Sequence, residues 1–202
     1  VYRYRQLQQQ KLARIRDRIA KDLHDDMGST LSSIRIFSDV LQTQIADTKP
    51  EAIPLLQRIS TNAATLAESM QDIIWTIKAQ HDGLSDVVSR MREFGLRLTE
   101  AKGIRFSMNV TEPFPAMKLN IEQRRNLYLI FKESVNNAVK YADCSELTVS
   151  LSIIGRQLSI QIDDNGRGFE PTLIRLGNGL TNLKTRAQDI GGTIQISSSP
   201  GV

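Results

Sequence analysis

The stretch RIRDRIAKDLHDDMGSTL, residues Arg14–Leu31, carries the strongest structural pattern in the chain and one of its two histidines, His24. Around it, apolar residues recur at steps of three and four from Leu12 to Ile45. This spacing predicts one long amphipathic helix. The helix should end before Pro50, because proline cannot continue a helix interior and restricts the residue before it.

A second helical pattern follows the proline and runs to Ile77. Two helices joined by a short turn predict an antiparallel hairpin. The apolar stripe on each helix is too long for one partner helix to cover. We therefore expect residues 1–78 to pair with a second copy as a four-helix bundle, so that the protein is a homodimer.

The polar residues 79–83, which end in a glycine, are the best candidate for a linker. Beyond them, residues 84–202 alternate between helical and strand patterns. Helices are expected at 84–102, 121–142 and 179–190, and strands at 104–110, 147–154, 157–163 and 193–197. This order predicts an α+β fold, in which helices cover one face of a sheet as an α/β sandwich.

Composition narrows the class of protein. A charged fraction of 24% and a net charge of +4 are ordinary for a globular domain, and no stretch is apolar enough to span a membrane. The single cysteine, Cys144, fits a reducing cytoplasm. The basic residues before His24 form either a solvated helix face or a segment just inside a membrane. Because the chain begins with valine and not with methionine, we expect it to be a fragment of a longer protein. With the basic residues just inside a membrane, it would be the cytoplasmic portion of a protein that a preceding segment anchors in the inner membrane.

His24 stands next to an acid, Asp25. A neutral imidazole can attack a phosphorus atom through one nitrogen if its other nitrogen holds the proton, and an adjacent carboxylate can hold that tautomer. Taken alone, such a pair is more often a surface hydrogen bond. Gly28 in mid-helix costs about 1 kcal/mol relative to alanine, which suggests close approach of another group.

The predicted helix at 121–142 places Glu133, Asn137 and Lys140 on one face. Glutamate and asparagine offer oxygen ligands for Mg²⁺, and lysine offers a charge for phosphate oxygens. A solvated polar face would look the same. Further along the chain, Asp164-Asn-Gly166-Arg-Gly168 follows a strand, and Gly177-Asn-Gly179 opens a helix that starts at Leu180. Glycines permit tight turns beside a bound base, and backbone amides at a helix start bind phosphate readily.

In these motifs the sequence resembles the bacterial sensor histidine kinases of two-component systems. The segment LHDDMG resembles the phosphoacceptor helix of the subfamily that signals to NarL-type response regulators. The second half resembles the nucleotide-binding fold shared by gyrase, Hsp90 and MutL. The resemblance implies an ATP-dependent enzyme that phosphorylates its own histidine and passes the phosphoryl group to an aspartate in the receiver domain of a response regulator.

The resemblance also implies residue roles. His24 would be the phosphoacceptor and Asp25 its acid/base partner, and Asn137 and Glu133 would hold Mg²⁺. The ATP site would be built from these two residues and Lys140, Tyr141, Asp164, Gly166, Gly168, Gly177, Gly179 and Leu180. Tyr141 would line the adenine pocket and Asp164 would read the adenine, while residues 169–178 would form a lid.

Two departures from the family pattern stand out. Members that dephosphorylate their partner carry glutamine or histidine where this chain has Ser29, so we expect that activity to be weak. The family also continues with a final strand beyond the point where this chain stops, so part of the adenine pocket is expected to be missing.

Two rival functions are a serine kinase of the anti-sigma type, which has no reason for the His-Asp hairpin, and a dimerising scaffold with a degenerate nucleotide pocket. Nucleic-acid binding is not expected, because the basic stretch lacks the interleaved aromatic residues of a single-strand binder.

Overall fold

The computed structural model describes residues 2–78, 83–111, 117–155, 157–169 and 178–199. The chain divides into two compact units, residues 1–81 and 82–202. Residues 79–82 of the predicted linker lie outside the described residues. In the described part of the chain, no helix has the length and apolar character needed to cross a membrane.

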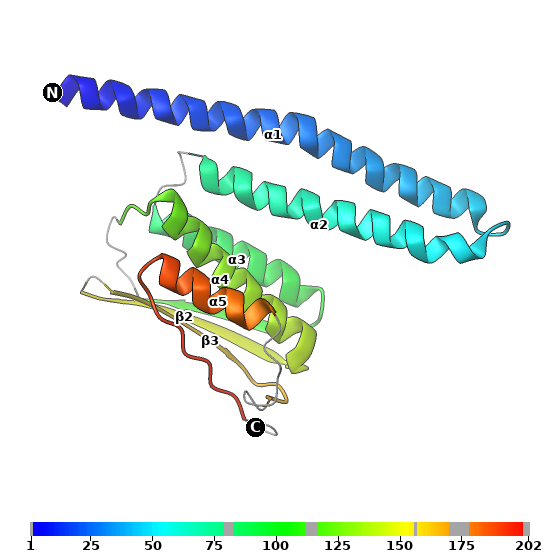
Figure 1. Ribbon diagram of the computed structural model, residues 1–202. Helices are drawn as coiled ribbons and strands as arrows, with labels where there is room; N and C mark the ends of the chain where they lie inside the picture. The colour runs from blue at the N-terminus through cyan, green and yellow to red at the C-terminus, as the bar shows by residue number, and fades with distance from the viewer. Residues whose placement is uncertain (1, 79–82, 112–116, 156, 170–177, 200–202) are drawn as a thin grey trace. The chain divides into compact units, whose positions relative to one another are not determined.

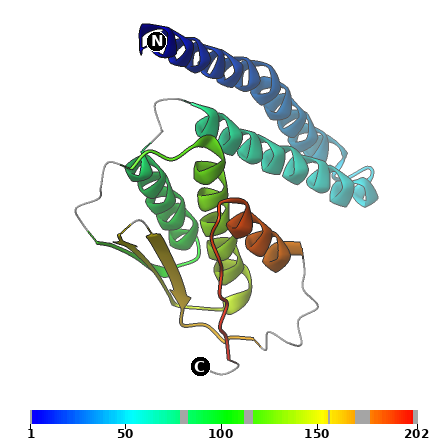
Figure 2. The ribbon, with the colours of Figure 1, turned by 60° about the vertical axis from the view of Figure 1, so that its left-hand side comes forward.

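The first unit is a helical hairpin, as predicted. Helix α1 (Tyr2–Ile45) is followed by a short 3₁₀ turn, η1 (Pro50–Ala52), and by helix α2 (Ile53–Ile77). The two helices run antiparallel and lie side by side in both ribbon views (Figures 1 and 2). Helix α1 begins ten residues before the apolar pattern, because residues 2–11 are rich in glutamine and arginine, which favour helix.

The contact between α1 and α2 uses small residues. Ala20 is fully buried against Met70 and Ile74 of α2, and Leu23 packs on the same cluster. Gly28 also faces Met70. Larger apolar side chains of the predicted stripe remain exposed on α1, among them Leu12, Ile15, Ile19, Met27, Ile34, Phe37 and Leu41.

The second unit is built on a three-stranded sheet. Strand β1 (Arg105–Val110) pairs in parallel with β2 (Glu146–Ile154), and β2 pairs antiparallel with β3 (Gln157–Asp164). The parallel pair needs a crossover, which helix α4 (Ile121–Asn137) provides. Gly155, with φ +63°, lies in the predicted β2–β3 turn, where positive φ favours glycine.

Helices α3 (Leu84–Glu100), α4 and α5 (Asn178–Asp189) lie on one face of this sheet (Figures 1 and 2). Leu147, Val149 and Leu151 alternate along β2 and are buried. Phe94 of α3 makes edge-to-face contacts with the rings of Tyr128 and Phe131 in α4. The predicted α+β arrangement, with helices covering a sheet, is therefore confirmed.

One predicted strand is wrong. Residues 193–197 form no strand, although their burial alternates, with Ile194 and Ile196 half-buried between exposed neighbours. The alternation is that of an extended chain with one face on the protein. A strand also needs backbone hydrogen bonds to a neighbouring strand, and the described sheet ends at β3.

Candidate functional site

His24 lies on an uninterrupted stretch of α1 and is open to solvent. Its side chain is 67% exposed, whereas the preceding residue, Leu23, is half-buried. The imidazole Nδ1 lies 3.2 Å from Oδ1 of Asp25. Because a carboxylate only accepts hydrogen bonds, this contact favours the tautomer with the proton on Nδ1 and leaves the lone pair on Nε2.

The second group of predicted site residues lies at the end of α4. At Ala138 the α-helix gives way to a π-helical turn, η3 (Ala138–Ala142), which contains Lys140 and Tyr141 with both side chains exposed. Asp143 follows in the left-handed conformation, with φ 56°. π-Helical turns are rare and are frequently found at functional sites.

Glu133 and Asn137 meet the start of α5. A methyl group added to Gly179 would lie 2.7 Å from Oε1 of Glu133 and 3.9 Å from Nδ2 of Asn137. The backbone at the beginning of α5 therefore passes directly over these two side chains, and Leu180 follows it half-buried. The predicted residue Gly177 and residues 170–177 of the predicted lid lie outside the described residues.

The loop after β3 folds back on the end of α4. Oδ1 of Asp164 accepts a hydrogen bond from the backbone N–H of Gly166 at 3.1 Å, which closes a tight turn and uses one of the two carboxylate oxygens. The next side chain, Asn165, accepts from the N–H groups of Ser145 and Glu146 through Oδ1, at 3.0 and 2.9 Å. These bonds attach the loop to the segment that leads into β2.

Both glycines of this loop are required by their surroundings. A Cβ atom on Gly166 would lie 2.2 Å from the carbonyl oxygen of Ala142, which is backbone and cannot move aside easily. Gly168 has φ +62°, and a Cβ there would lie 2.0 Å from the carbonyl oxygen of Ser199. The chain after it is held by a hydrogen bond from the Phe169 N–H to Oγ of Ser198, at 2.9 Å.

The thiol of Cys144 is partly buried and lies near the negative charges of Asp164 and Asp143. Burial raises the pKa of its thiol above the ordinary value of 9.0, and the negative charges of Asp164 and Asp143 raise it further. The thiol therefore stays protonated at neutral pH. The effect of Asp164 shows that the end of β3 and the segment after η3 are close enough to interact electrostatically.

The side chains of Glu133 and Asn137 supply some, but not all, of the oxygen ligands that a Mg²⁺ ion needs. Glu133 and Asn137 stand one helical turn apart and offer oxygens, whereas Mg²⁺ usually takes one or two protein oxygens together with phosphates and water. Among the described residues, no group of three or more His, Cys, Asp or Glu side chains is placed to hold a metal by itself. The residues present therefore fit a Mg²⁺ ion that is shared with a nucleotide.

The structure adds two residues that motif reading did not single out, Asn165 and Arg167. Nε of Arg167 donates to the carbonyl oxygen of Tyr141 at 3.0 Å, and its backbone N–H donates to that of Ala142 at 2.8 Å. In the sequence, Asn165 stands between Asp164 and Gly166, and Arg167 stands between Gly166 and Gly168. Their partners lie about twenty residues earlier, so only the fold reveals the contacts.

Two protein family models match the chain. Residues 16–93 match the family model described as "Histidine kinase", and residues 122–202 match "Histidine kinase-, DNA gyrase B-, and HSP90-like ATPase". Together the two matches take in both candidate sites, His24 and the residues around Asn137 and Asp164.

Individual relatives agree as well. The chain is 28% identical over 193 residues to the signal transduction histidine-protein kinase/phosphatase UhpB of Salmonella typhimurium, covering 93% of this chain and 37% of UhpB. It is 27% identical over 196 residues to the nitrate/nitrite sensor protein NarQ of Escherichia coli, covering 96% of this chain and 34% of NarQ. The chain thus spans little more than a third of the length of these two relatives.

Among solved structures, the histidine kinase domain of the blue-light activated kinase of Erythrobacter litoralis EL346 has a TM-score of 0.57 to this chain. The match covers 94% of this chain and 89% of that domain at 14% identity, and it supports the fold alone. Because the two family models match in this order and the relatives are sensor kinases, the chain belongs to the sensor histidine kinases of two-component systems, with a helical histidine kinase region followed by a GHKL-type ATPase domain.

Proposed function

We propose that the chain is a kinase core that transfers the γ-phosphoryl group of ATP to His24. The contact between Nδ1 of His24 and Oδ1 of Asp25, 3.2 Å on an exposed helix face, is the observation that carries this proposal. It leaves Nε2 as a nucleophile that a second domain can reach. In this reaction Nε2 attacks the γ-phosphorus, the bond to the bridging oxygen breaks, and ADP leaves with the electron pair.

Asp25 stabilises the charge that develops during the attack. As the ring becomes cationic, its Nδ1–H faces a carboxylate, which either keeps the hydrogen bond or accepts the proton. Positioning and charge neutralisation supply most of the rate in phosphoryl transfer. The exposure of His24 fits a group that must receive the phosphoryl from one partner and pass it to another.

The second unit supplies the nucleotide site in this proposal. The free carboxylate oxygen of Asp164 would accept from the adenine amino group, with exposed Tyr141 beside the base. Lys140 and the backbone at Gly179 would face the phosphates. Glu133 and Asn137 would hold Mg²⁺, which supplies positive charge to the phosphate oxygens when it is bound.

A receiver domain of a NarL-type response regulator would take the phosphoryl group from His24 onto an aspartate.

One relative is named a kinase/phosphatase, and Ser29 bears on that second activity. The hydroxyl of Ser29 donates to the Asp25 carbonyl oxygen at 2.7 Å, so it is directed into its own helix. We therefore expect this chain to remove phosphate from its regulator slowly. Rapid release that survives substitution of His24 would contradict this expectation.

The exposed apolar face of the hairpin supports a homodimer. Because α1 meets α2 through Ala20 and Gly28, the larger side chains of its stripe are left for a second copy, which would complete a four-helix bundle. Light scattering on Ile19→Glu should show monomers. Leu96→Glu, which changes an equally exposed leucine of α3, should leave the dimer intact.

Nucleotide binding followed by phosphoryl relay tests the whole proposal. The purified chain should bind Mg²⁺-ATP, and Asp164→Asn should weaken binding by about tenfold to a hundredfold. The amide oxygen would stay with the N–H of Gly166, so an NH₂ donor would face the adenine amino group in place of an acceptor. Label from γ-labelled ATP should then move from the chain to a purified receiver domain. A chain that binds no nucleotide would instead favour the scaffold function.

A further inference from the structure

We propose that Arg167 is a positioning residue of the nucleotide site, which fixes Tyr141 against Asp164 and so sets the affinity for the adenine base. This inference rests on the proposed function, because it concerns the same ATP site. It assigns a role to a side chain that the motif leaves unspecified, between the two glycines of Asp164–Gly168.

The first step is the need for an anchor at the end of α4. The last carbonyl groups of a helix have no partner within the helix. Here the last turn is π-helical and is followed by Asp143 in the left-handed conformation, so its course departs from that of a regular helix. Tyr141 lies in this turn, with a side chain that is 64% exposed.

Arg167 supplies the anchor with two donors. Its backbone N–H donates a hydrogen bond to the carbonyl oxygen of Ala142, and its Nε–H donates one to the carbonyl oxygen of Tyr141. A cation at the C-terminal end of a helix is also favoured by the helix dipole. Only the second bond depends on the side chain at 167, so substitution tests it separately from the fold of the loop.

The second step is that the same loop holds Asp164. Its Oδ1 bonds the N–H of Gly166, and Gly166 lies against Ala142 so closely that no side chain fits. Asn165 ties the other side of the loop to Ser145 and Glu146. The loop therefore carries Asp164 at one end and the anchor for Tyr141 at the other, and Arg167 sets the spacing between the two groups that face the base.

Affinity measurements on the complete chain test the proposal, with Arg167→Ala, Arg167→Lys and Arg105→Ala. Arg105 is the matched control, because it is an exposed arginine of the same unit and its ion pair with Glu146 is a long surface contact of 3.8 Å. We expect Arg167→Ala to weaken the binding of Mg²⁺-ADP and Mg²⁺-ATP by the same factor of about ten, because the contact lies on the base side of the nucleotide. Arg105→Ala should bind as the wild type does.

Kinetics separate positioning from general damage. Arg167→Ala should raise the KM for ATP by a similar factor, while the rate of autophosphorylation at saturating ATP stays near that of the wild type. Arg167→Lys keeps the charge and the backbone bond, and should weaken binding in the same direction by a smaller factor. If Arg167→Ala does not fold, the nucleotide affinity of Arg167→Lys is compared with that of the wild type.

Wild-type affinity in Arg167→Ala, or in Arg167→Lys where the alanine variant does not fold, would overturn this inference. So would a fall in the saturated rate without a change in affinity. Failure of the wild-type chain to bind either nucleotide would instead refute the proposed function, so the two failures are distinguishable.

Discussion

The two candidate sites of this chain are built in opposite ways. His24 stands on a regular helix, exposed, with one side-chain contact to its neighbour in sequence. The site around Asp164 combines a π-turn, a left-handed Asp143, a glycine with positive φ, and hydrogen bonds between segments about twenty residues apart. In the proposed function, the first site presents one exposed side chain to other domains, and the second is a preformed nucleotide site.

This difference follows from what each site must do. A phosphoacceptor has to be reached by a nucleotide domain and then by a second protein, so exposure matters more than surrounding structure. A nucleotide site must hold several groups at fixed spacing before the ligand arrives, since ordering them on binding would cost affinity. Substitutions at the two sites should therefore differ in kind.

The largest expected contrast comes from Gly166→Ala. Its Cβ would meet the carbonyl oxygen of Ala142 at 2.2 Å, so the loop must move. We expect an overpacking cost of about 2–3 kcal/mol, which lowers nucleotide affinity by roughly a hundredfold. Titration calorimetry with Mg²⁺-ADP measures it. Unchanged affinity would mean that the loop after β3 does not form the nucleotide site.

Asp25→Asn tests the simpler site. The amide removes the charge that favours the proton on Nδ1 of His24, so the autophosphorylation rate should fall by about a hundredfold. Nucleotide affinity should not change. Asp26→Asn, which alters the next acid along the same helix, is the control and should keep the wild-type rate. Equal losses in both variants would argue that general negative charge matters and the contact with His24 does not.

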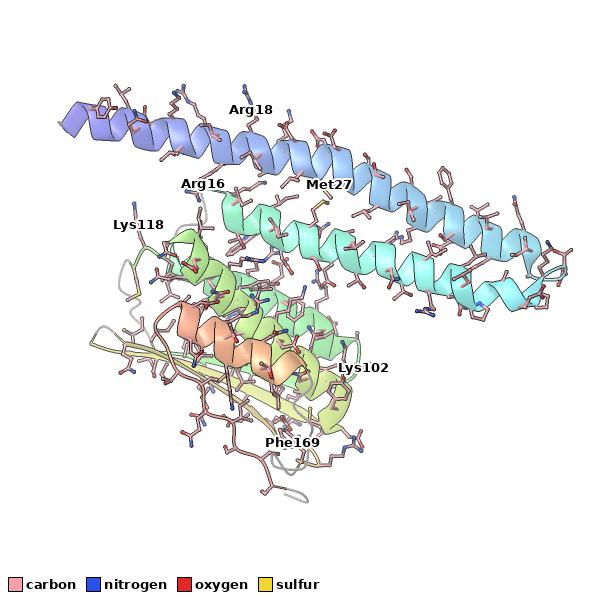
Figure 3. All side chains as sticks on the ribbon, viewed as in Figure 1. Arg16, Arg18, Met27, Lys102, Lys118 and Phe169 are labelled. Carbon is pink, nitrogen blue, oxygen red and sulfur yellow. The ribbon has the colours of Figure 1, made fainter. Side chains whose placement is uncertain are left out.

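Arg16→Ala should weaken the hairpin moderately. Nε of Arg16 donates to the carbonyl oxygen of Ile77 at 2.7 Å, at the end of α2. Losing a hydrogen bond from a charged donor should lower the free energy of unfolding by about 1–2 kcal/mol, measured by urea denaturation. Figure 3 shows Arg18 pointing away from α2, so Arg18→Ala is a suitable control. Equal stability of the two variants would contradict this role.

Gly28→Ala should have the opposite sign to Gly166→Ala. The added Cβ would lie 3.5 Å from Cε of Met70, an ordinary contact, and alanine favours helix. The free energy of unfolding should rise by up to about 1 kcal/mol, seen as a higher Tm. A lower Tm would show that α1 and α2 approach more closely here. A higher Tm with slower phosphotransfer would support the expectation that another molecule approaches this glycine.

The smallest effect concerns Cys144. Because its pKa is raised in the folded chain, the native thiol holds its proton to higher pH than the unfolded thiol. Its contribution to stability is present below the ordinary value of 9.0 and is lost as pH rises above it. Alkylation by iodoacetamide should therefore reach half its maximal rate at higher pH in the native chain than in urea. The reverse order would contradict the burial of the thiol beside Asp164.

The sequence predicted the regular parts of this fold because their signals are local. Steps of three and four predicted α1 and α2, and the alternating runs at 147–154 and 157–163 predicted β2 and β3. The predicted strand at 193–197 failed because alternation reports burial on one face and says nothing about a neighbouring strand. The π-turn at Ala138–Ala142 was missed, since a helical pattern does not reveal a change from α to π geometry.

The candidate site shows the same limit. Side chains that touch a ligand, such as Asn137 and Asp164, stand out by type and spacing. Asn165 and Arg167 act through backbone groups of Ser145 and Tyr141, and a backbone partner leaves no mark on residue identity. Contacts of this kind are visible only once the fold brings the segments together.

Incubation with γ-labelled ATP and Mg²⁺, comparing the wild-type chain with His24→Gln, tests most directly whether His24 accepts the phosphoryl group. We predict label on the wild type that is lost in acid, as expected for phosphohistidine, and no label on the variant, which should still bind ATP as tightly. Acid-stable label, or equal labelling of both proteins, would contradict the central claim that His24 accepts the phosphoryl group.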